Sequence, residues 1–376
     1  MEWSAPLPNG LAMGQDGGSV NHQTESERTM AKNSVKEEIK VLGIDLGKRS
    51  FSLHGINARG EGFFRRQMGR SKLIEFIASL KPCLVGMEAC GGSNYLARKF
   101  QEFGHEVRLM APQFVKPYVK SNKSDAIDAE AICEAVQRPS MRFVPAKSVA
   151  QQDLQSLHRA RSLTVGQRTA QINQIRGFLH EYGIVLPKGS KIIRERLPAM
   201  LKESGNDLTD WMRELLGNLR NVVIQLEERI ESYNKKLKQI SQDDVRCRRL
   251  LTIPGIGVLT ATALLAGVGD VSVFKNGRQM AAWLGLVPRQ HSTGGKARLL
   301  GISKRGDVYL RTLMIHGARA ALRCAGRRDD PRSRWVKGIA DRSCNNIAAV
   351  ALANKNARIA WALLKKDENY QAALAA

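Results

Sequence analysis

The first regular pattern of the chain starts at Ile39, with short hydrophobic segments of the length that strands have. Residues Ile39–Asp45 form an apolar run, and Ser50–Ile56 alternates apolar with polar positions. A turn at Asn57–Gly60 leads to a third strand-like segment, Gly62–Met68. Segments of this length, separated by turn residues, predict a meander of three β-strands.

The next segments switch between the helical and the strand period. Apolar residues recur at helical spacing in Arg70–Leu80, Ser93–Phe103 and Asp125–Gln137. Between them, Cys83–Met87 and Glu106–Met110 are short apolar runs typical of buried strands. Three strands followed by alternating helices and strands predict an α/β domain, with a mixed sheet that carries helices on its faces.

The middle of the chain predicts long helices. Ser148 and Gln151 have the spacing of a capping box, in which each side chain bonds the backbone of the other residue. A second helix is expected at about Leu208–Ile240, where apolar residues repeat at heptad steps with one four-residue stutter. This apolar series consists of Leu215, Leu219, Val222, Leu226, Ile230, Tyr233, Leu237 and Ile240. Two such helices predict a coiled-coil arm for self-association, and a plain helical core is the alternative.

The last region contains a turn pattern associated with DNA binding. Residues Ile253–Gly257 read Ile-Pro-Gly-Ile-Gly and precede a predicted helix at Val258–Ala266. Pro-Gly-x-Gly between helices is typical of a helix-hairpin-helix, which here would offer the backbone around Gly255 and Gly257 to a DNA phosphate. An ordinary helix connection is the alternative. Residues 287–306 are rich in Gly, Ser, Lys and Arg and predict a loop, after which helices follow.

These patterns divide the chain into four parts. Residues 1–36 are rich in Gly, Ser, Asn and Gln and lack periodicity, which predicts a disordered leader. Residues 37–147 are expected to form the α/β domain, 148–246 the helical coiled-coil region, and 247–376 a mainly α-helical C-terminal domain. Met30 is an alternative start, because regular sequence begins shortly after it.

The charge of the chain indicates a polyanionic partner. Among 376 residues there are 59 Lys and Arg against 35 Asp and Glu, a formal net charge of +24. Residues 287–376 alone hold 18 basic and 6 acidic side chains. Such an excess predicts nucleic-acid binding. A solubilising surface or attraction to anionic lipid is the alternative, although neither an amphipathic anchor nor a lipidation motif supports lipid.

Two further observations exclude other classes of protein. The longest mostly apolar run, Ile256–Val268, is shorter than the roughly 20 residues that a membrane span needs. We therefore expect no membrane partner. The 6 Cys show neither Cys-x-x-Cys spacing nor a His at ligand spacing. The sequence thus predicts reduced cytosolic thiols, and neither a zinc site nor a disulfide framework.

Four acidic residues stand where their carboxylates could converge. Asp45 ends the first predicted strand, Glu88 follows the fourth, and Asp125 and Asp128 share one face at the start of a helix. Converging carboxylates repel one another unless cations compensate them. A pair of Mg²⁺ ions would do so, and would also activate a hydroxyl and stabilise the leaving oxygen of a phosphodiester. The acids predict a ribonuclease-H-like metal site; singly, Asp45 could be a turn cap, and Asp125 or Asp128 a helix N-cap.

Six motifs are specific as a set. They are Gly-Ile-Asp-Leu-Gly at 43–47, Met-Glu-Ala-Cys-Gly-Gly at 87–92, Lys-Ser-Asp-Ala-Ile-Asp-Ala-Glu-Ala-Ile at 123–132, Ile-Pro-Gly-Ile-Gly at 253–257, Trp-Leu-Gly-Leu-Val-Pro-Arg-Gln-His-Ser-Thr-Gly-Gly-Lys at 283–296, and Ile-Ser-Lys-Arg-Gly-Asp at 302–307. With these motifs the chain resembles the DEDD transposases of the IS110 insertion-sequence family, and most of all its IS1111 subgroup. The resemblance runs from about Ile39 to near the C-terminus, while residues 1–36 have no counterpart.

The resemblance implies a fold and a set of catalytic residues. It implies an N-terminal RuvC-like domain, a coiled-coil region and a C-terminal transposase domain. The four acids of the family correspond to Asp45, Glu88, Asp125 and Asp128, which would hold Mg²⁺, with Mn²⁺ as the alternative ion. Its serine nucleophile corresponds to Ser292, which in the family forms a covalent phosphoserine link to DNA at the site of the metal-binding acids.

The resemblance also implies partners. Family members recombine double-stranded donor and target DNA, and are guided by a structured RNA encoded beside the gene, called bridge or seeker RNA. They act as homo-oligomers, dimers or tetramers, with active sites shared between protomers. For such an enzyme we expect a bacterial cytoplasmic, nucleoid-associated location.

The residue types around Ser292 are compatible with this role. Ser292 precedes two glycines, and Lys296, Arg298, Lys304 and Arg305 follow within a short distance along the chain. Cations of this kind can offset the negative charge that develops during phosphoryl transfer. We therefore expect these four side chains to contact nucleic acid.

Alternatives remain open for the serine and for the function. Ser292 could be a turn residue, Thr293 and Ser303 are rival nucleophiles, and His291 is a candidate proton acceptor that the resemblance does not require. Gly-Ile-Asp-Leu-Gly also opens actin-like ATPases and sugar kinases, but the sequence shows no second phosphate loop of the Asp-Gly-Gly type. A RuvC-like nuclease or a DNA-binding protein without guide RNA is the other alternative.

Overall fold

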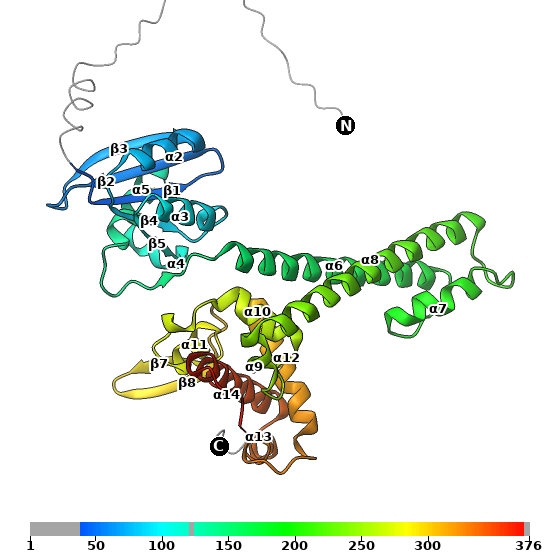
Figure 1. Ribbon diagram of the computed structural model, residues 1–376. Helices are drawn as coiled ribbons and strands as arrows, with labels where there is room; N and C mark the ends of the chain where they lie inside the picture. Colours follow the sequence, from blue (N-terminus) through cyan, green and yellow to red (C-terminus); the bar gives the residue numbers. More distant parts are fainter. Residues whose placement is uncertain (1–37, 120–123, 372–376) are drawn as a thin grey trace, which may run out of the picture. The chain divides into compact units, whose positions relative to one another are not determined.

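The computed structural model describes residues 38–119 and 124–371 (Figure 1). The chain forms two compact units that divide between Ala146 and Lys147. The first unit combines strands with helices, whereas the second is mainly helical. The predicted leader at 1–36 lies outside the described residues, and the finer division of the second unit between residues 246 and 247 stays a prediction.

The first unit is built on a six-stranded sheet of order β3-β2-β1-β4-β5-β6. Its strands are β1 (Val41–Leu46), β2 (Ser50–Ile56), β3 (Gly62–Gly69), β4 (Leu84–Glu88), β5 (Glu106–Met110) and β6 (Phe143–Val144). The first three form the predicted antiparallel meander, and β4 and β5 continue the sheet in parallel with β1. The sequence did not predict β6, because two residues show no readable period.

Helices cover both faces of this sheet. The helices α2 (Arg70–Ser79) and α3 (Ser93–Glu102) share a hydrophobic core with Leu42 and Ile44 of β1. Successive strand residues point to opposite faces, and Gly43 between those two lies against α5 (Asp125–Ala135) on the other face. The short elements α4 (Pro112–Val115) and η1 (Lys116–Tyr118) follow β5. The predicted mixed sheet with helices on its faces is confirmed, and it is consistent with a ribonuclease-H-like domain.

The second unit begins with a long pair of helices. These are α6 (Val149–Glu181) and α8 (Asp210–Asp243), with α7 (Ser190–Met200) near their far end (Figure 1). The predicted capping box is present at the start of α6. There Ser148 Oγ accepts from the Gln151 backbone N–H at 3.2 Å, and Gln151 Oε1 accepts from the Ser148 backbone N–H at 3.0 Å.

The buried face of α8 differs from the predicted one in its first half. The predicted series included Leu215 and Val222, but the structure buries their neighbours Leu216 and Val223, and Val222 is 40% exposed. Later along α8, Leu226, Ile230 and Leu237 are buried as predicted. Starting the series one residue later removes the four-residue stutter, because the buried positions then follow a regular heptad.

Most of the remaining helices of the second unit pack against α14. The remaining helices are α9 (Val245–Leu251), α10 (Val258–Val268), η2 (Val271–Val273), α11 (Gly277–Trp283), α12 (Val308–Ala325), α13 (Pro331–Arg342) and α14 (Asn345–Lys366). One hydrophobic core joins α9–α14, and α14 contributes a series of buried alanines to it. Small side chains let neighbouring helices approach closely. Among the described residues, no helix is both long enough and apolar enough to span a membrane.

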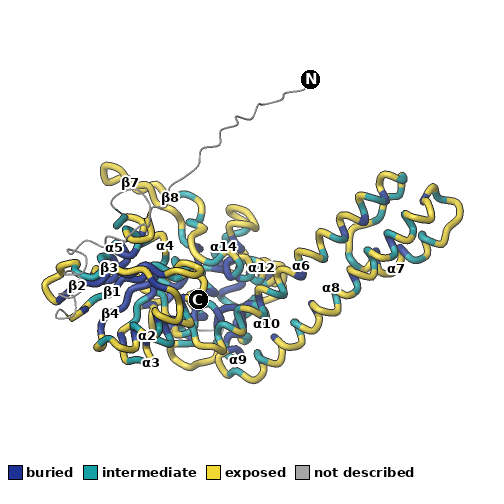
Figure 2. The backbone as a smooth tube through the Cα atoms, turned by 90° about the horizontal axis from the view of Figure 1, so that it is seen from above, coloured by how far each residue is buried: buried dark blue, intermediate teal, exposed yellow. Residues whose placement is uncertain are grey.

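The prediction of a loop at 287–306 is wrong. The segment contains an antiparallel hairpin of β7 (Pro288–Thr293) and β8 (Lys296–Ile302). Gly294 and Gly295 join the strands with positive φ angles of 56° and 77°, as a two-residue hairpin turn requires. All six residues of β7 are exposed, and Figure 2 shows the hairpin almost entirely in the colour of exposed backbone. With polar residues on both faces, β7 lacked the alternation that normally identifies a strand.

Candidate functional site

Asp45 and Glu88 are brought together by the pairing of β1 with β4. The two strands are parallel, and Ile44 is the register partner of Met87. Asp45 and Glu88 are the next residues along their strands, so both carboxylates lie at the carboxyl end of these two neighbouring strands. Each residue is half-buried. Carboxyl ends of adjacent parallel strands are a common location for functional side chains in α/β proteins.

Asp125 and Asp128 stand in the first turn of α5. The N-cap of this helix is Ser124, whose side chain accepts from the Ile127 backbone N–H at 3.4 Å. Neither aspartate is therefore the N-cap, and that alternative interpretation is wrong for both. Their spacing of three residues puts both carboxylates on one side of the helix.

Two glycines allow α5 to lie directly on the strands that carry the other acids. A Cβ atom built on Gly43 would overlap the Ala129 carbonyl and lie 2.6 Å from the Cys133 backbone nitrogen. A Cβ built on Gly86 of β4 would lie 2.8 Å from Val136 Cβ, just beyond the end of α5. Because strand residues alternate between faces, Gly43 shares its face with Asp45. The close approach thus sets the beginning of α5 beside the end of β1.

The result is a cluster of carboxylates. One ligand oxygen from each of Asp45, Asp125 and Asp128 lies within 4.8 Å of the others. Glu88 is not one of these three, but both Glu88 and Asp45 act on the nearby Cys90 thiol. Burial, then the Glu88 carboxylate, then the Asp45 carboxylate raise the pKa of the Cys90 thiol. Oxygen donors with this much negative charge in one place fit a divalent cation such as Mg²⁺.

Ser292 lies on the exposed hairpin of the second unit. It belongs to β7, opposite Ala297 of β8. Its Oγ accepts a hydrogen bond from Gln290 Nε2 at 2.7 Å. Gln290 is two residues away and so projects from the same face of the strand. Gln290 was not among the predicted site residues, because the i, i+2 relation to Ser292 applies only to a strand and no strand was predicted there.

Two of the cations expected around Ser292, Lys296 and Arg298, lie on the other face of the hairpin. His291 pairs with Arg298, and Thr293 pairs with Lys296, so these four side chains alternate with Ser292 and Ala297. His291 is therefore not placed to accept a proton from Ser292. The hairpin has a cationic face and an opposite face that carries the serine.

The remaining residues of interest follow the hairpin. Ser303 lies beyond the end of β8, and its backbone N–H donates to the Val287 carbonyl at 2.8 Å. Lys304 and Arg305 are exposed. Lys304 has a φ angle of 55°, and the Arg305 carbonyl accepts from Arg311 Nη1 at 3.1 Å. The backbone of this turn is thus fixed while the two cationic side chains remain accessible.

The Pro-Gly-Ile-Gly turn connects α9 to α10, and its two glycines differ. A Cβ on Gly255 would lie 2.8 Å from the Gly317 carbonyl of α12, so Gly255 is a packing contact. Nothing lies within 4 Å of a Cβ built on Gly257, which is exposed at the N-cap of α10. Among these two, Gly257 is the better placed for a phosphate.

Two buried side chains that the sequence analysis did not single out hold this turn. Arg332 Nη1 and Asn356 Nδ2 both donate to the Pro254 carbonyl, at 3.0 and 3.1 Å. Their positions in α13 and α14 are far from the turn in sequence, and nothing local in the sequence indicated them.

The fold and the acidic cluster are consistent with a ribonuclease-H-like domain, and comparison with known proteins identifies the class as insertion-sequence transposases. Residues 42–184 match the model of the DEDD transposases of IS110 elements, described as "Transposase". Residues 247–334 match "Transposase IS116/IS110/IS902 family". The chain belongs to the IS110/IS1111 family of insertion-sequence transposases, enzymes that cleave and rejoin DNA, and the resemblance seen in the sequence is confirmed.

Three relatives support this membership over most of the chain. A probable family 20 transposase of Pseudomonas aeruginosa is 51% identical over 331 residues, 88% of this chain and 98% of the relative. The transposase for insertion sequence element IS1111A of Coxiella burnetii is 46% identical over 97% of this chain and 98% of the relative. That for IS1328 of Yersinia enterocolitica is 44% identical over 86% and 96%.

Membership in this family has two consequences. An actin-like ATPase is no longer a viable interpretation of Gly-Ile-Asp-Leu-Gly, because the family acts on DNA. DEDD transposases use a divalent metal, which agrees with the cluster of Asp45, Asp125 and Asp128.

Proposed function

We propose that this transposase is an RNA-guided DNA recombinase with a metal-binding acidic site and a serine nucleophile. The observation that carries the proposal is the convergence of Asp45, Asp125 and Asp128, whose carboxylate oxygens lie within 4.8 Å of one another. The net charge of +24 supports polyanionic partners. These would be double-stranded donor and target DNA, and a structured guide RNA encoded beside the gene.

Asp45, Glu88, Asp125 and Asp128 would hold the metal through carboxylate oxygens, as Mg²⁺ prefers, with Mn²⁺ as the alternative. A bound divalent ion supplies Lewis-acid stabilisation of charge on phosphodiester oxygens. The contribution of the chain is pre-organisation: the sheet fixes Asp45 and Glu88, and the packing of α5 on Gly43 fixes the two aspartates of the helix.

Ser292 would be the nucleophile. Its Oγ attacks a backbone phosphorus and forms a serine–phosphate ester. The hydroxyl proton passes to solvent, and the deoxyribose oxygen that leaves takes up a proton. One phosphate ester replaces another, so a deoxyribose hydroxyl can later attack the phosphoserine, rejoin the DNA and release the serine. Gln290, which donates to Oγ at 2.7 Å, would orient the hydroxyl.

Contacts to nucleic-acid backbone are proposed for the accessible basic residues and turn. They would come from Lys296 and Arg298 on the cationic face of the hairpin, from Lys304 and Arg305 after it, and from the backbone at Gly257. Gly255 would contribute only by keeping the turn in place. An enzyme with these contacts would work at the bacterial nucleoid.

The arm formed by α6 and α8 is proposed to join protomers into a dimer or tetramer, with residues 148–246 as a coiled-coil region. Apolar side chains on its surface support this role. Leu163 is 65% exposed and Val222 is 40% exposed, and exposed apolar residues on a long helix pair are a common basis of association.

A cleavage assay with the full chain tests the chemistry. Protein expressed together with the DNA that flanks its gene would be incubated with element-end DNA and Mg²⁺. We expect a covalent protein–DNA adduct with the unchanged protein and none with Ser292→Ala. Asp45→Ala and Glu88→Ala should bind DNA normally and cleave neither strand. An undiminished adduct in Ser292→Ala would overturn the assignment of the nucleophile.

Sequencing the RNA that copurifies with the protein tests the guide. One discrete structured species from beside the gene, with loops complementary to the element ends and to a target, is the expected result. Bulk cellular RNA alone, or no RNA, would overturn guidance. The same acids would then serve a RuvC-like nuclease or DNA-binding protein that needs no guide.

A further inference from the structure

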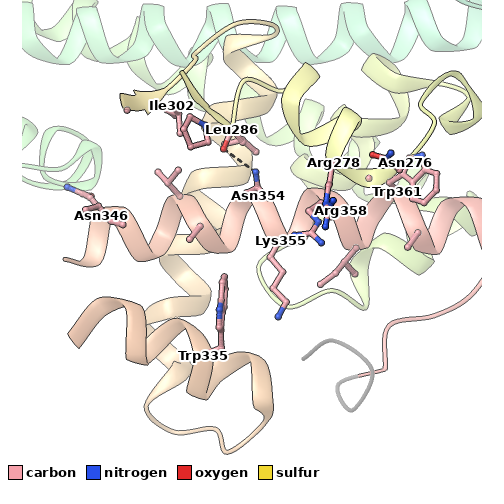
Figure 3. Close-up of a pocket in the computed structure, with 18 of the residues that line it drawn as sticks. Asn276, Arg278, Leu286, Ile302, Trp335, Asn346, Asn354, Lys355, Arg358 and Trp361 are labelled. Atoms are coloured by element: carbon pink, nitrogen blue, oxygen red, sulfur yellow. Dashed lines mark hydrogen bonds between the residues drawn. The ribbon is translucent and has the colours of Figure 1, made fainter. Parts of the chain in front are cut away.

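A groove of about 1340 Å³ runs beside α14 in the second unit (Figure 3). Its walls come from α11, α13 and α14 and from the base of the hairpin that carries Ser292, through Pro288, Leu300 and Ile302. Most of the lining is apolar. The residues proposed above for the metal, the nucleophile and the phosphate contacts do not line it.

The charged residues that line this groove are all cations. They are Arg278 of α11 and Lys355 and Arg358 of α14, and within the described part of the chain none of them pairs with a carboxylate. The two helices touch closely, since a Cβ on Gly277 would lie 2.9 Å from Arg358 Cα. Burial, followed by repulsion from Arg358 and Arg332, lowers the pKa of the Lys355 ammonium. Cations held together without a counter-charge create a positive potential that attracts an anion.

An indole stands in the wall next to these cations. Trp335 of α13 is 36% exposed, and Lys355 Nζ lies 4.6 Å from the centre of its ring. Figure 3 shows Trp335 rising from α13 toward α14, with Lys355 beside it. The other indole of the lining, Trp361, uses its N–H to bond the carbonyls of Val271 and Phe274. Trp361 is thus part of the fold, whereas Trp335 is partly exposed and has Lys355 over one side of its ring, which leaves the other side for a ligand to stack on.

We propose that this groove binds an unpaired stretch of a DNA strand, with a base stacked on Trp335 and phosphates held by Lys355, Arg358 and Arg278. Aromatic faces next to cations are how proteins hold single strands. A duplex keeps its base faces stacked inside, so an apolar wall with an accessible indole fits a strand that has left its pairing. Because the lining contains three cations and no acidic residue, it favours a polyanion as the occupant over an apolar helix of another protein.

The part of the groove formed by the hairpin suggests which DNA strand would occupy it. Pro288 and Ile302 border the groove at the base of the ribbon whose β7 strand carries Ser292. Because the groove borders the base of this ribbon, the proposal assigns it the strand that the serine attacks, and this step of the inference rests on the proposed function.

Fluorescence anisotropy with fluorescein-labelled oligothymidylate and the full chain tests the proposal. We expect Trp335→Ala to weaken binding by about tenfold or more, because stacking of one base contributes that much. Trp335→Phe should recover part of the affinity. Lys355→Ala should reduce the slope of log affinity against log salt by about 0.7, as one lost phosphate contact does on a single strand. Trp211→Ala and Lys366→Ala are matched controls at exposed positions outside the groove, and should bind as the unchanged protein does.

Normal oligothymidylate affinity in both Trp335→Ala and Lys355→Ala, with unchanged circular dichroism, would overturn the proposal. A change in oligomeric state by light scattering, without a change in DNA affinity, would overturn it in favour of a second copy of the chain. Tighter Trp335-dependent binding of oligouridylate than of oligothymidylate would overturn it in favour of RNA. Because the assay measures binding, its failure beside a lost adduct in Ser292→Ala would reject the groove alone and leave the nucleophile in place.

Discussion

The acidic cluster and the serine hairpin are built in opposite ways. The acidic residues of the cluster are positioned by a packed interface. There, Gly43 and Gly86 allow α5 and the residue that follows it to lie close against the sheet. Ser292 rests on a two-stranded ribbon whose β7 residues are all exposed. In the cluster, packing determines where each carboxylate lies. In the hairpin, the alternation of side chains along the strand and the two-glycine turn determine where the serine hydroxyl lies. Equivalent substitutions should therefore have different consequences in the two regions.

The largest effect is expected on catalysis, and metal binding should separate the two regions. Asp128→Asn and Ser292→Ala should both abolish strand cleavage. Mg²⁺ titration by calorimetry should show much weaker binding in Asp128→Asn, because the loss of one charge lowers affinity at an all-oxygen site. Ser292→Ala should bind the ion as the unchanged protein does. Equal Mg²⁺ affinity in Asp128→Asn and the unchanged protein would contradict the metal-binding role of the cluster.

The same glycine-to-alanine change should be severe in the sheet and mild in the hairpin. In Gly43→Ala the new methyl group overlaps the Ala129 carbonyl, which should cost about 3 kcal/mol or more of unfolding free energy, because backbone atoms cannot move aside, and should weaken Mg²⁺ binding by displacing α5. Gly295→Ala meets no atom within 4 Å and costs only its positive φ, about 1–2 kcal/mol within the ribbon. Urea denaturation with Mg²⁺ titration measures both. Normal Mg²⁺ affinity in Gly43→Ala would show that the close approach does not position the acids.

The smallest of the three effects concerns the hydrogen bond on the serine face. Gln290→Ala should slow adduct formation at saturating DNA by about tenfold, the equivalent of one hydrogen bond. Arg298→Ala on the opposite face should instead weaken DNA binding and leave the rate at saturation unchanged. Single-turnover kinetics over a range of DNA concentrations distinguishes the two outcomes. A normal saturated rate in Gln290→Ala would remove Gln290 from the chemistry.

The two regions also differ in how well the sequence predicted them. The first unit was predicted almost completely, because buried strands and helices leave clear apolar periods. The same runs placed Asp45 and Glu88 at neighbouring strand ends and Asp125 at a helix start. Their convergence additionally required the glycines that bring α5 close, and the sequence showed Gly43 only as part of a motif.

The second unit was predicted less well for physical reasons that concern particular residues. β7 has polar side chains on both faces and so no hydrophobic alternation, and the whole segment was predicted as a loop despite Gly294 and Gly295 between the strands. The buried series of α8 was displaced by one residue at Leu216 and Val223, because apolar neighbours occupy both candidate positions. Long-range contacts such as that of Arg332 with Pro254 have no local signal.

The helical arm also sets a length scale. With 34 residues, α8 extends for about 50 Å, since an α-helix rises 1.5 Å per residue. That distance equals roughly 15 base pairs of B-form DNA at 3.4 Å each. Contacts made near α7 and contacts made near α9 are therefore more than one helical turn of a duplex apart. The length of the arm thus fixes the spacing between the elements at its two ends, and removing or adding one heptad would change that spacing by about 10 Å.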